Sequence, residues 1–282
     1  MKIIAIIPSR YGSSRFPGKP LALISGKPMI QWVYENVRKA KEVDDVYVAT
    51  DEQKIFECVN GFDGKAIMTS PLHTCGTDRL AECVDILNID EEDIVLNIQG
   101  DEPLINPSMI VDLYRIFEDS EVYMGTLMKK IDRDDELDNP NVVKVITDIH
   151  HNAIYFSRYL LPYERAGKKS VHFKHIGVYG YKAWFLKKIS KMGKSELEKS
   201  ESLEQLRIIE NGFKIRVKET NYQTIGVDTP EQIKLVEEVL EKIPRSIDEL
   251  AQDEAFYSCI QVATMGAMRA YQKEKQELFA NA

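Results

Sequence analysis

Short apolar runs alternate with amphipathic stretches through the first half of the chain. The runs have the length of buried strands, and the amphipathic stretches repeat their apolar residues at helical spacing. The predicted strands are 2–7, 46–49 and 94–98, and the predicted helices are 28–40, 77–87 and 107–118. Strands that alternate with helices in this order form a parallel sheet with right-handed crossover connections. We therefore expect an α/β fold with a mostly parallel central sheet.

The middle of the chain has a different pattern. Strand-like segments follow one another there with few helices between them, at 122–128, 142–147, 153–156 and 174–180. Strands joined without crossover helices usually pair antiparallel. We expect an antiparallel extension at about 122–215, which either walls a second pocket or pairs with a second copy of the chain in a homodimer.

The last part of the chain begins with a predicted helix. Asp228 is followed by Thr-Pro, and this combination suits the start of a helix. Apolar residues recur at helical spacing over 233–240, and Pro244 ends the pattern. We expect a main domain at 1–244 and a C-terminal helical extension at 245–282, whose apolar face packs on the main domain or on a second subunit.

Composition and charge narrow the classes of function. The chain has 282 residues and a formal net charge of −8, which argues against general nucleic-acid binding. Its four cysteines form no CxxC pair, and no apolar run approaches the ~20 residues that cross a bilayer. A predicted strand begins directly after Met1, without the pattern of a secretory leader. We expect a cytoplasmic protein that binds a small ligand and no membrane.

A loop with three cations follows the first strand. Arg10, Arg15 and Lys19 lie within the segment 8–21, and Pro8 ends the strand before them. Glycine and serine residues between the cations allow the backbone to approach phosphate oxygens, and arginine binds such oxygens through two donors. A proline follows Lys19, so the loop is not a Walker motif. The loop is therefore predicted to bind a phosphorylated ligand; the alternative is a solvated basic loop.

Carboxylates follow two other predicted strands. Asp101 and Glu102 come just after the strand 94–98, and Asp228 lies between a strand-like run and the last helix. Mg²⁺ takes one or two carboxylates together with substrate phosphates, and two such residues opposite a phosphate loop suit nucleotidyl transfer. The alternatives are a Gly-Asp-Pro turn at the first position and a helix cap at Asp228.

Other polar residues are candidates for ligand recognition. Thr77 and Arg79 begin a predicted helix, where they either contact a base or ribose or act as a cap and a surface charge. In the antiparallel region, arginine can bind a carboxylate and the histidine, glutamate and glutamine side chains can bind hydroxyls. These candidates are Arg158, His175, Glu204 and Gln205. Their alternative is an ordinary role in strand or surface polarity.

Taken together, these segments resemble the CMP-Kdo synthetase family, the 3-deoxy-manno-octulosonate cytidylyltransferases. The resemblance covers residues 2 to about 240. The matching segments, in chain order, are PSRYGSSRFPGKPL, VYVATD, HTCGTDRLAE, NIQGDEP, NPNVVKV, YFSR, KHIGVYGY, LEQLR and GVDTP. CMP-sialic acid synthetases resemble the first segment but lack the QGDEP and HIGVYGY segments. The resemblance implies a Rossmann-like nucleotide-diphospho-sugar transferase fold, with 1–244 as the cytidylyltransferase domain.

The resemblance also implies an activity. The family transfers a cytidylyl group from CTP to the anomeric hydroxyl of the acid sugar 3-deoxy-D-manno-octulosonate (Kdo), giving CMP-Kdo and diphosphate for lipopolysaccharide or capsule biosynthesis. Alternatives are the same chemistry on 8-amino-Kdo or another ulosonic acid, and a nucleotide-binding relative without activity.

Residue roles follow from the matching positions. The resemblance implies that the nucleotide is bound by Pro8, Arg10, Ser13, Arg15, Lys19, Thr77 and Arg79. It implies that Arg10, Lys19, Asp101 and Asp228 are catalytic, with Mg²⁺ on the two aspartates. The implied sugar-binding residues are Gln99, Arg158, His175, Glu204 and Gln205. Cys75 and Lys174 stand where the family usually has Ser and Arg, so they are candidates for tuning sugar preference.

Overall fold

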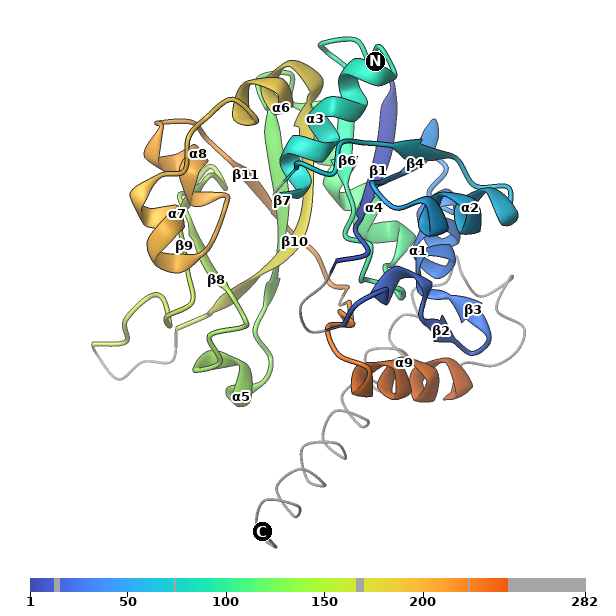
Figure 1. Cartoon of the computed structure of the whole chain (residues 1–282). Helices are drawn as coiled ribbons and strands as arrows, with labels where there is room; N and C mark the ends of the chain where they lie inside the picture. Colours follow the sequence, from blue (N-terminus) through green and yellow to red (C-terminus); the bar gives the residue numbers. More distant parts are fainter. Residues whose placement is uncertain (13–15, 74, 166–169, 223, 243–282) are drawn as a thin grey trace, which may run out of the picture.

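The computed structural model describes residues 1–12, 16–73, 75–165, 170–222 and 224–242 (Figure 1). Within these residues the main sheet has nine strands, and seven of them follow the order β11-β7-β10-β6-β1-β4-β5. The neighbouring strands β1 (Ile3–Ser9), β4 (Asp45–Thr50), β5 (Ala66–Met68) and β6 (Ile94–Asn97) are parallel. The predicted parallel half of the sheet is therefore confirmed.

The antiparallel strands are joined to the middle of this sheet. They are β7 (Met124–Lys130), β8 (Lys144–Thr147), β9 (Ala153–Ser157) and β10 (Phe173–Lys182), and β11 (Arg216–Glu219) completes the sheet beside β7. Strand β10 pairs antiparallel with both β6 and β7, whereas β11 is parallel to β7. The expected antiparallel strands are present. The longest of them, β10, lies within the main sheet between β6 and β7, and it also pairs with β8, which in turn pairs with β9.

Helices cover both faces of the sheet. The helices of at least five residues are α1 (Met29–Arg38), α2 (Gln53–Gly61), α3 (Gly76–Ile86), α4 (Pro107–Arg115), α6 (Ala183–Ile189), α7 (Glu196–Glu201), α8 (Leu206–Glu210) and α9 (Glu231–Lys242). The shorter elements are η1 (Lys19–Leu21), β2 (Leu23–Ile24), β3 (Lys27–Pro28), η2 (Ile116–Glu118) and α5 (Asp134–Leu137). In Figure 1, α1 and α2 lie to the right of the sheet, and α7 and α8 lie to the left with β8 and β9.

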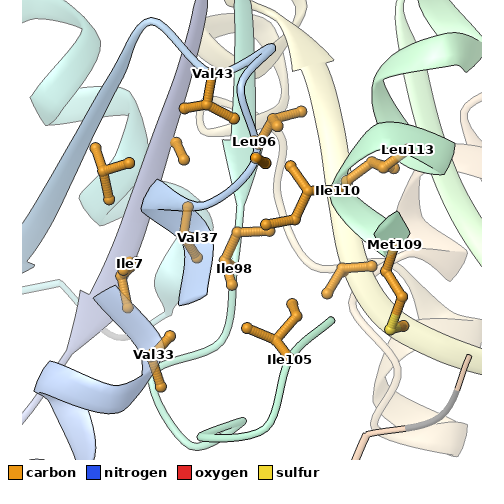
Figure 2. Packing of buried hydrophobic residues seen from close by; sticks show 14 of the residues in the cluster. Ile7, Val33, Val37, Val43, Leu96, Ile98, Ile105, Met109, Ile110 and Leu113 are labelled. Carbon is orange, nitrogen blue, oxygen red and sulfur yellow. The ribbon is translucent and has the colours of Figure 1, made fainter. Parts of the chain in front are cut away.

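Alternation along β1 shows how the core is divided. Ile7 points to one face, where it packs with α1, α2 and α4 (Figure 2), whereas Ile6 belongs to the cluster formed with α3, α6 and α8 on the other face. Successive strand residues point to opposite faces, so an uninterrupted apolar run is needed where both faces are covered. A third cluster packs α9 against the short β2 strand and Met29. This third contact holds the segment that carries Asp228 against the main body.

The structure changes several predicted boundaries. The predicted helix 107–118 ends as an α-helix at Arg115 and continues as the 3-10 helix η2. Helix α2 and strand β5 were not predicted, because α2 buries only Ile55 and Val59 and β5 has three residues. The segment 245–282 lies outside the described residues, so its helical extension stays a prediction. Among the described helices, none is both long enough and apolar enough to cross a membrane.

Candidate active site

Three charged side chains meet at the carboxyl edge of the parallel strands. Lys19 Nζ donates to Asp101 Oδ2 at 2.7 Å and to Asp228 Oδ1 at 3.3 Å. Lys19 begins η1 after Gly18, whose φ of +71° is in the left-handed region that glycine adopts freely. The amide of Val227 donates to the carbonyl of Asp101 at 2.9 Å and ties the two acidic segments together. The predicted grouping of the three residues is therefore observed.

These side chains line a cavity of about 350 Å³, which we call the charged cavity. Its lining residues are Pro8, Ser9, Arg10, Gly12, Lys19, Pro20, Gly76, Arg79, Gln99, Gly100, Asp101 and Asp228. A Cβ at Gly100 would lie 2.7 Å from Ser9 Oγ and 3.1 Å from the Pro8 carbonyl. A glycine is therefore needed where the end of β6 approaches the end of β1. The predicted residues Ser13 and Arg15 lie outside the described residues.

Glu102 lies behind the two aspartates. Burial, and then the negative charge of Asp101, raises the pKa of the Glu102 carboxyl to about 8. Its Oε2 is buried without a hydrogen-bond partner among the described residues, and its carboxyl also bonds the Thr224 side chain. A buried carboxyl in such surroundings favours the neutral form. Asp101 and Asp228 therefore supply the carboxylate oxygens that face the charged cavity.

Arg79 is buried at the border of the charged cavity. Its guanidinium donates to Asp51 Oδ2 at 2.8 Å and to the Thr69 hydroxyl, so it joins α3 to the loops that follow β4 and β5. The side chain is fully buried, and its Nε has no hydrogen-bond partner among the described residues. Arg79 thus lines the predicted nucleotide site while two of its nitrogens are engaged with the protein.

A second cavity of about 140 Å³ adjoins the first, and we call it the aromatic cavity. Its lining residues are Gly76, Thr77, Asn97, Gln99, Met124, Tyr179, Tyr181, Ile189, Glu204, Gln205 and Ile208. Gly76 and Gln99 line both cavities. Three predicted sugar-binding residues, Gln99, Glu204 and Gln205, are therefore together, and the predicted nucleotide residue Thr77 lies with them.

The aromatic cavity includes residues that were not predicted as ligand contacts. The Tyr181 hydroxyl hydrogen-bonds the side chains of Asn97 and Thr77, and burial raises the pKa of Tyr181 above its usual value. The Tyr179 and Tyr181 rings are stacked with centroids 6.0 Å apart. Their alternate positions along one strand were the only sequence signal that placed them on a common face. Asn97 gave no signal beyond its position at a strand end.

His175 does not line the aromatic cavity, but its ring contacts that of Tyr179, which does. Its ring is 5.3 Å from that of Tyr179 and 5.0 Å from that of Phe156, and its Nε2 is 3.0 Å from Thr126 Oγ1. Burial lowers the pKa of His175 to about 3, so the imidazole is neutral near pH 7. The structure thus places the partly exposed His175 beside the predicted sugar pocket, next to the Tyr179 ring that lines it.

Arg158 lines neither cavity. Its guanidinium donates to the carbonyls of Glu201 at 2.7 Å, Pro140 at 2.8 Å and Ser202 at 3.4 Å. Its backbone amide also donates to the Glu201 carboxylate at 2.9 Å. Arg158 therefore connects the end of β9 to α7 and to the segment before β8, and the structure does not bring it together with Gln99, the residue shared by both cavities.

The charged cavity suits a divalent cation held jointly with a ligand. The carboxylates of Asp101 and Asp228 already share one cationic group, the ammonium of Lys19. Within the described ranges, no three His, Cys, Asp or Glu side chains converge closely enough to hold a metal ion by themselves. Mg²⁺ commonly takes one or two carboxylates and completes its shell with phosphate oxygens and water. The residues present fit that kind of site.

Comparison with known proteins agrees with this geometry. Residues 4–218 match the family model described as cytidylyltransferase. A 3-deoxy-manno-octulosonate cytidylyltransferase from Thermodesulfovibrio yellowstonii is 48% identical over 251 residues, which cover 85% of this chain and 98% of the relative. An 8-amino-3,8-dideoxy-manno-octulosonate cytidylyltransferase from Shewanella pealeana is 46% identical over 239 residues, covering 84% of this chain and 98% of the relative.

A solved structure gives the same result. It is that of a CMP:2-keto-3-deoxy-manno-octonic acid synthetase in complex with CTP, with a TM-score of 0.81 and 41% sequence identity. The match covers 86% of this chain and 99% of the other chain. The similarity therefore extends over most of this chain, and the chain belongs to the family of 3-deoxy-manno-octulosonate cytidylyltransferases.

Proposed function

We propose that this protein transfers the cytidylyl group of CTP to the anomeric hydroxyl of Kdo and releases diphosphate. The observation that carries the proposal is the meeting of two unlike cavities at Gln99 and Gly76. One has charged groups suited to a triphosphate, and the other has the hydroxyl, amide and ring groups that suit a polyol. Two substrates held side by side react as if within one molecule, which accounts for a large part of many enzymatic rate enhancements.

The nucleotide side depends on the cations of the charged cavity. Lys19 and Arg10 contribute positive charge, and Pro8 and Gly100 bring backbone close to the ligand. Ser13 and Arg15 belong to the same loop and are proposed to bind phosphate oxygens with them. Lys19 pairs with two aspartates and offsets only one of their two negative charges, so a triphosphate that arrives with its own cation would release the ammonium toward the phosphates. The proposed leaving group, diphosphate, departs from this cationic end.

Mg²⁺ is the proposed cofactor, held by Asp101 and Asp228 with phosphate oxygens of CTP. A bound Mg²⁺ neutralises charge on the phosphates and lowers the pKa of a hydroxyl beside it. The two aspartates are 2.7 and 3.3 Å from the Lys19 ammonium, so their oxygens converge on a volume that a single positive charge can fill. Their contribution is to orient that charge between the two cavities.

The sugar side is proposed to recognise hydroxyl groups. Glu204 lines the aromatic cavity, and among the described residues its buried Oε1 has no hydrogen-bond partner, although it lies 3.9 Å from the Arg207 guanidinium. A carboxylate oxygen accepts hydrogen bonds only, so a sugar hydroxyl would satisfy it. The Gln99 amide donates to Asn97 Oδ1 at 3.2 Å, which leaves its carbonyl oxygen available as an acceptor. Gln205 and His175 are proposed as further sugar-binding residues.

The related amino sugar is the second candidate acceptor. A relative that is 46% identical over most of both chains carries the name 8-amino-3,8-dideoxy-manno-octulosonate cytidylyltransferase. The unsatisfied Glu204 oxygen would accept a hydrogen bond from an ammonium group as well as from a hydroxyl. A catalytically silent relative is disfavoured, because Lys19, Asp101 and Asp228 are all present and converge.

The assembly and location are also proposals. The segment between β9 and β10 exposes Tyr159, Tyr163 and Val171, which are 81%, 87% and 54% exposed. Apolar surface of this kind suits contact with a second copy of the chain, so we propose a homodimer in the cytoplasm that serves lipopolysaccharide or capsule synthesis. Analytical ultracentrifugation of the full chain would test this proposal, and a monomer at micromolar concentration would contradict it.

One assay tests the activity and the acceptor together. Purified protein is mixed with CTP, Mg²⁺ and one sugar from a panel of Kdo, 8-amino-Kdo and a sialic acid, and diphosphate release is followed. Release with Kdo at the highest kcat/KM supports the proposal, and a preference for 8-amino-Kdo supports the second candidate. ATP in place of CTP is the nucleotide control. No release with any ulosonic acid would refute the activity.

A further inference from the structure

Strand β10 carries an irregularity where it passes the aromatic cavity. Ile176 pairs with Leu127 of β7, and the next paired residues are Tyr179 and Thr126. Two residues of β10 therefore lie between positions that are consecutive on β7. Such bulges bend a strand locally and change where its side chains point. In this protein the bulge lies between His175 and Tyr179.

The bulge brings two rings together. Side chains four positions apart on a regular strand are separated by about 13 Å along the strand axis. The rings of His175 and Tyr179 have centroids only 5.3 Å apart. Since Tyr179 lines the aromatic cavity and stacks on Tyr181, the bulge determines how the histidine supports the cavity wall.

The buried hydroxyl of Thr126 contacts three residues of the bulged part of β10. Thr126 is fully buried, and its Oγ1 lies 2.7 Å from the Val178 carbonyl, 3.2 Å from the Ile176 carbonyl and 3.0 Å from His175 Nε2. A threonine hydroxyl has one proton to donate and accepts through its lone pairs. Carbonyl oxygens only accept, and two oxygens 2.7 Å apart need a proton between them, so the hydroxyl proton is assigned to the carbonyl pair, with Val178 the closer partner.

The same proton count determines which ring nitrogen of His175 carries the proton. Because the Thr126 proton goes to a carbonyl, the contact with His175 requires the ring to donate from Nε2 to Oγ1. A neutral imidazole carries one proton, so Nδ1 is then an acceptor. Burial keeps the ring neutral by lowering the pKa of His175 to about 3. A sugar hydroxyl can donate to such an acceptor, whereas a sugar carboxylate cannot.

We propose that Thr126 is a positioning residue for the aromatic cavity. Its hydroxyl bonds both sides of the β10 bulge and holds His175 in the Nε2-protonated tautomer. The Nδ1 atom of His175 is then a hydrogen-bond acceptor beside Tyr179. The proposal rests on the proposed function for the identity of the acceptor, a polyhydroxylated acid sugar. The tautomer and the bulge themselves are properties of the protein without substrate.

The test compares Thr126→Val, which removes the hydroxyl at nearly constant volume, with Thr126→Ser, which keeps it. Thr220→Val is the matched control, because Thr220 is 2% exposed and its hydroxyl bonds Asp112, which lines neither cavity. The measurements are KM for the sugar and for CTP, and the nitrogen-15 spectrum of the imidazoles, with His175 assigned by its loss in His175→Gln.

We expect wild type, Thr126→Ser and Thr220→Val to show His175 protonated at Nε2. Thr126→Val is expected to lose this signature and to raise KM for the sugar about tenfold, the effect of one buried hydrogen bond, while KM for CTP stays within about twofold. An Nδ1-protonated ring in wild type would overturn the proposal even if Thr126→Val does not fold. Equal rises in both KM values, or an unchanged sugar KM in Thr126→Val, would also overturn it. If wild type uses no ulosonic acid, the proposed function fails, whereas the imidazole spectra still decide the role of Thr126.

Discussion

The two cavities are built in different ways. The charged cavity takes its ionic groups from short segments near strand ends and helix starts: Arg10 directly follows β1, Lys19 begins η1, Asp101 lies between β6 and α4, and Asp228 lies shortly before α9. The aromatic cavity takes its wall from β6, β7, β10, α3, α6 and the segment that leads into α8. The first depends on where strands end, and the second depends on how distant segments pack. The charged groups of the first cavity can therefore be recognised in short sequence segments. The sugar-binding groups of the second cavity come together only when distant segments pack.

The strongest test of this contrast removes a charge from the first cavity. Asp101→Asn keeps the shape of the side chain but removes the charge that faces Lys19 and the proposed Mg²⁺. We expect kcat to fall about 10²- to 10³-fold, the usual effect of losing a group that stabilises transition-state charge. CTP affinity, measured by calorimetry, is expected to change far less.

The exposed Asp90→Asn is the control for this prediction and is expected to behave as wild type. If Asp101→Asn weakened CTP binding as much as it lowered kcat, the carboxylate would act mainly in ground-state binding. The charged cavity would then be a binding site whose chemistry is supplied elsewhere.

Arg158 gives the second test, because sequence and structure assign it differently. The resemblance makes it a sugar-binding residue, whereas the structure engages its guanidinium with three backbone carbonyls. We expect Arg158→Ala to lower the free energy of unfolding by about 1 kcal/mol, because three carbonyls, two of them in exposed hydrogen bonds, lose a charged donor. KM for the sugar should change less than threefold well below the melting temperature. A large rise in KM at unchanged stability would return Arg158 to the acceptor site.

A smaller effect is expected from Glu204→Gln in the aromatic cavity. The amide has one acceptor oxygen and no charge, so it is a poorer partner for sugar hydroxyls than the carboxylate. We expect KM for the sugar to rise about tenfold, equivalent to the loss of one charge-assisted hydrogen bond. KM for CTP should not change.

Glu196→Gln removes an 85% exposed carboxylate and is the control for Glu204→Gln. If Glu204→Gln changed both KM values equally, the two cavities would not be separable. The contrast between a nucleotide side and an acceptor side would then fail.

The last prediction concerns acid stability. The pKa of His175 is about 3 in the folded protein and about 6.5 when exposed, so between these values the unfolded chain binds the extra proton. Stability is therefore lost as pH falls from about 6.5 to 3, by at most about 1.4 kcal/mol per pH unit from this group. Urea unfolding of His175→Gln between pH 7 and 4 is expected to show a shallower loss than wild type. An equal slope would show that burial does not lower the pKa of His175.

The sequence predicted the charged cavity better than the aromatic one for a physical reason. The loop with Lys19 follows β1 and Asp101 follows β6, and an open α/β sheet brings these strand ends to one edge. Asp228 was predicted after a strand-like run, but in the structure it lies in a segment without strand structure before α9. The role of Thr126 depends on a bulge in a partner strand about fifty residues away, and no local pattern encodes that register. A glycine in a strand often marks a bulge, so Gly177 was an available signal, but Gly180 in the same strand gave the same signal outside the bulge.

The details of the fold that the sequence did not predict have a similar origin. The alternation of strands and helices predicted the parallel strands, but not that β10 inserts between β6 and β7. Sequential strands are usually neighbours, and pairing order leaves little trace in a single strand. Arg158 shows the same limit for side chains. Its forked donor group suits a carboxylate or backbone carbonyls equally well, and only the packing of α7 decides between them.

The position of β10 also constrains how the chain is made. Strands β6 and β7 are consecutive along the chain, yet they do not pair with each other in the sheet. Both pair with β10, which spans Phe173–Lys182 and lies between them. When only the first 170 residues have been synthesised, the nascent chain has two unpaired strand edges, one on β6 and one on β7, because β10 has not yet been made. Open edges attract other strands, including those of neighbouring nascent chains. Codon pauses and chaperone contacts before residue 182 are thus expected to affect the yield of this protein more than those after it.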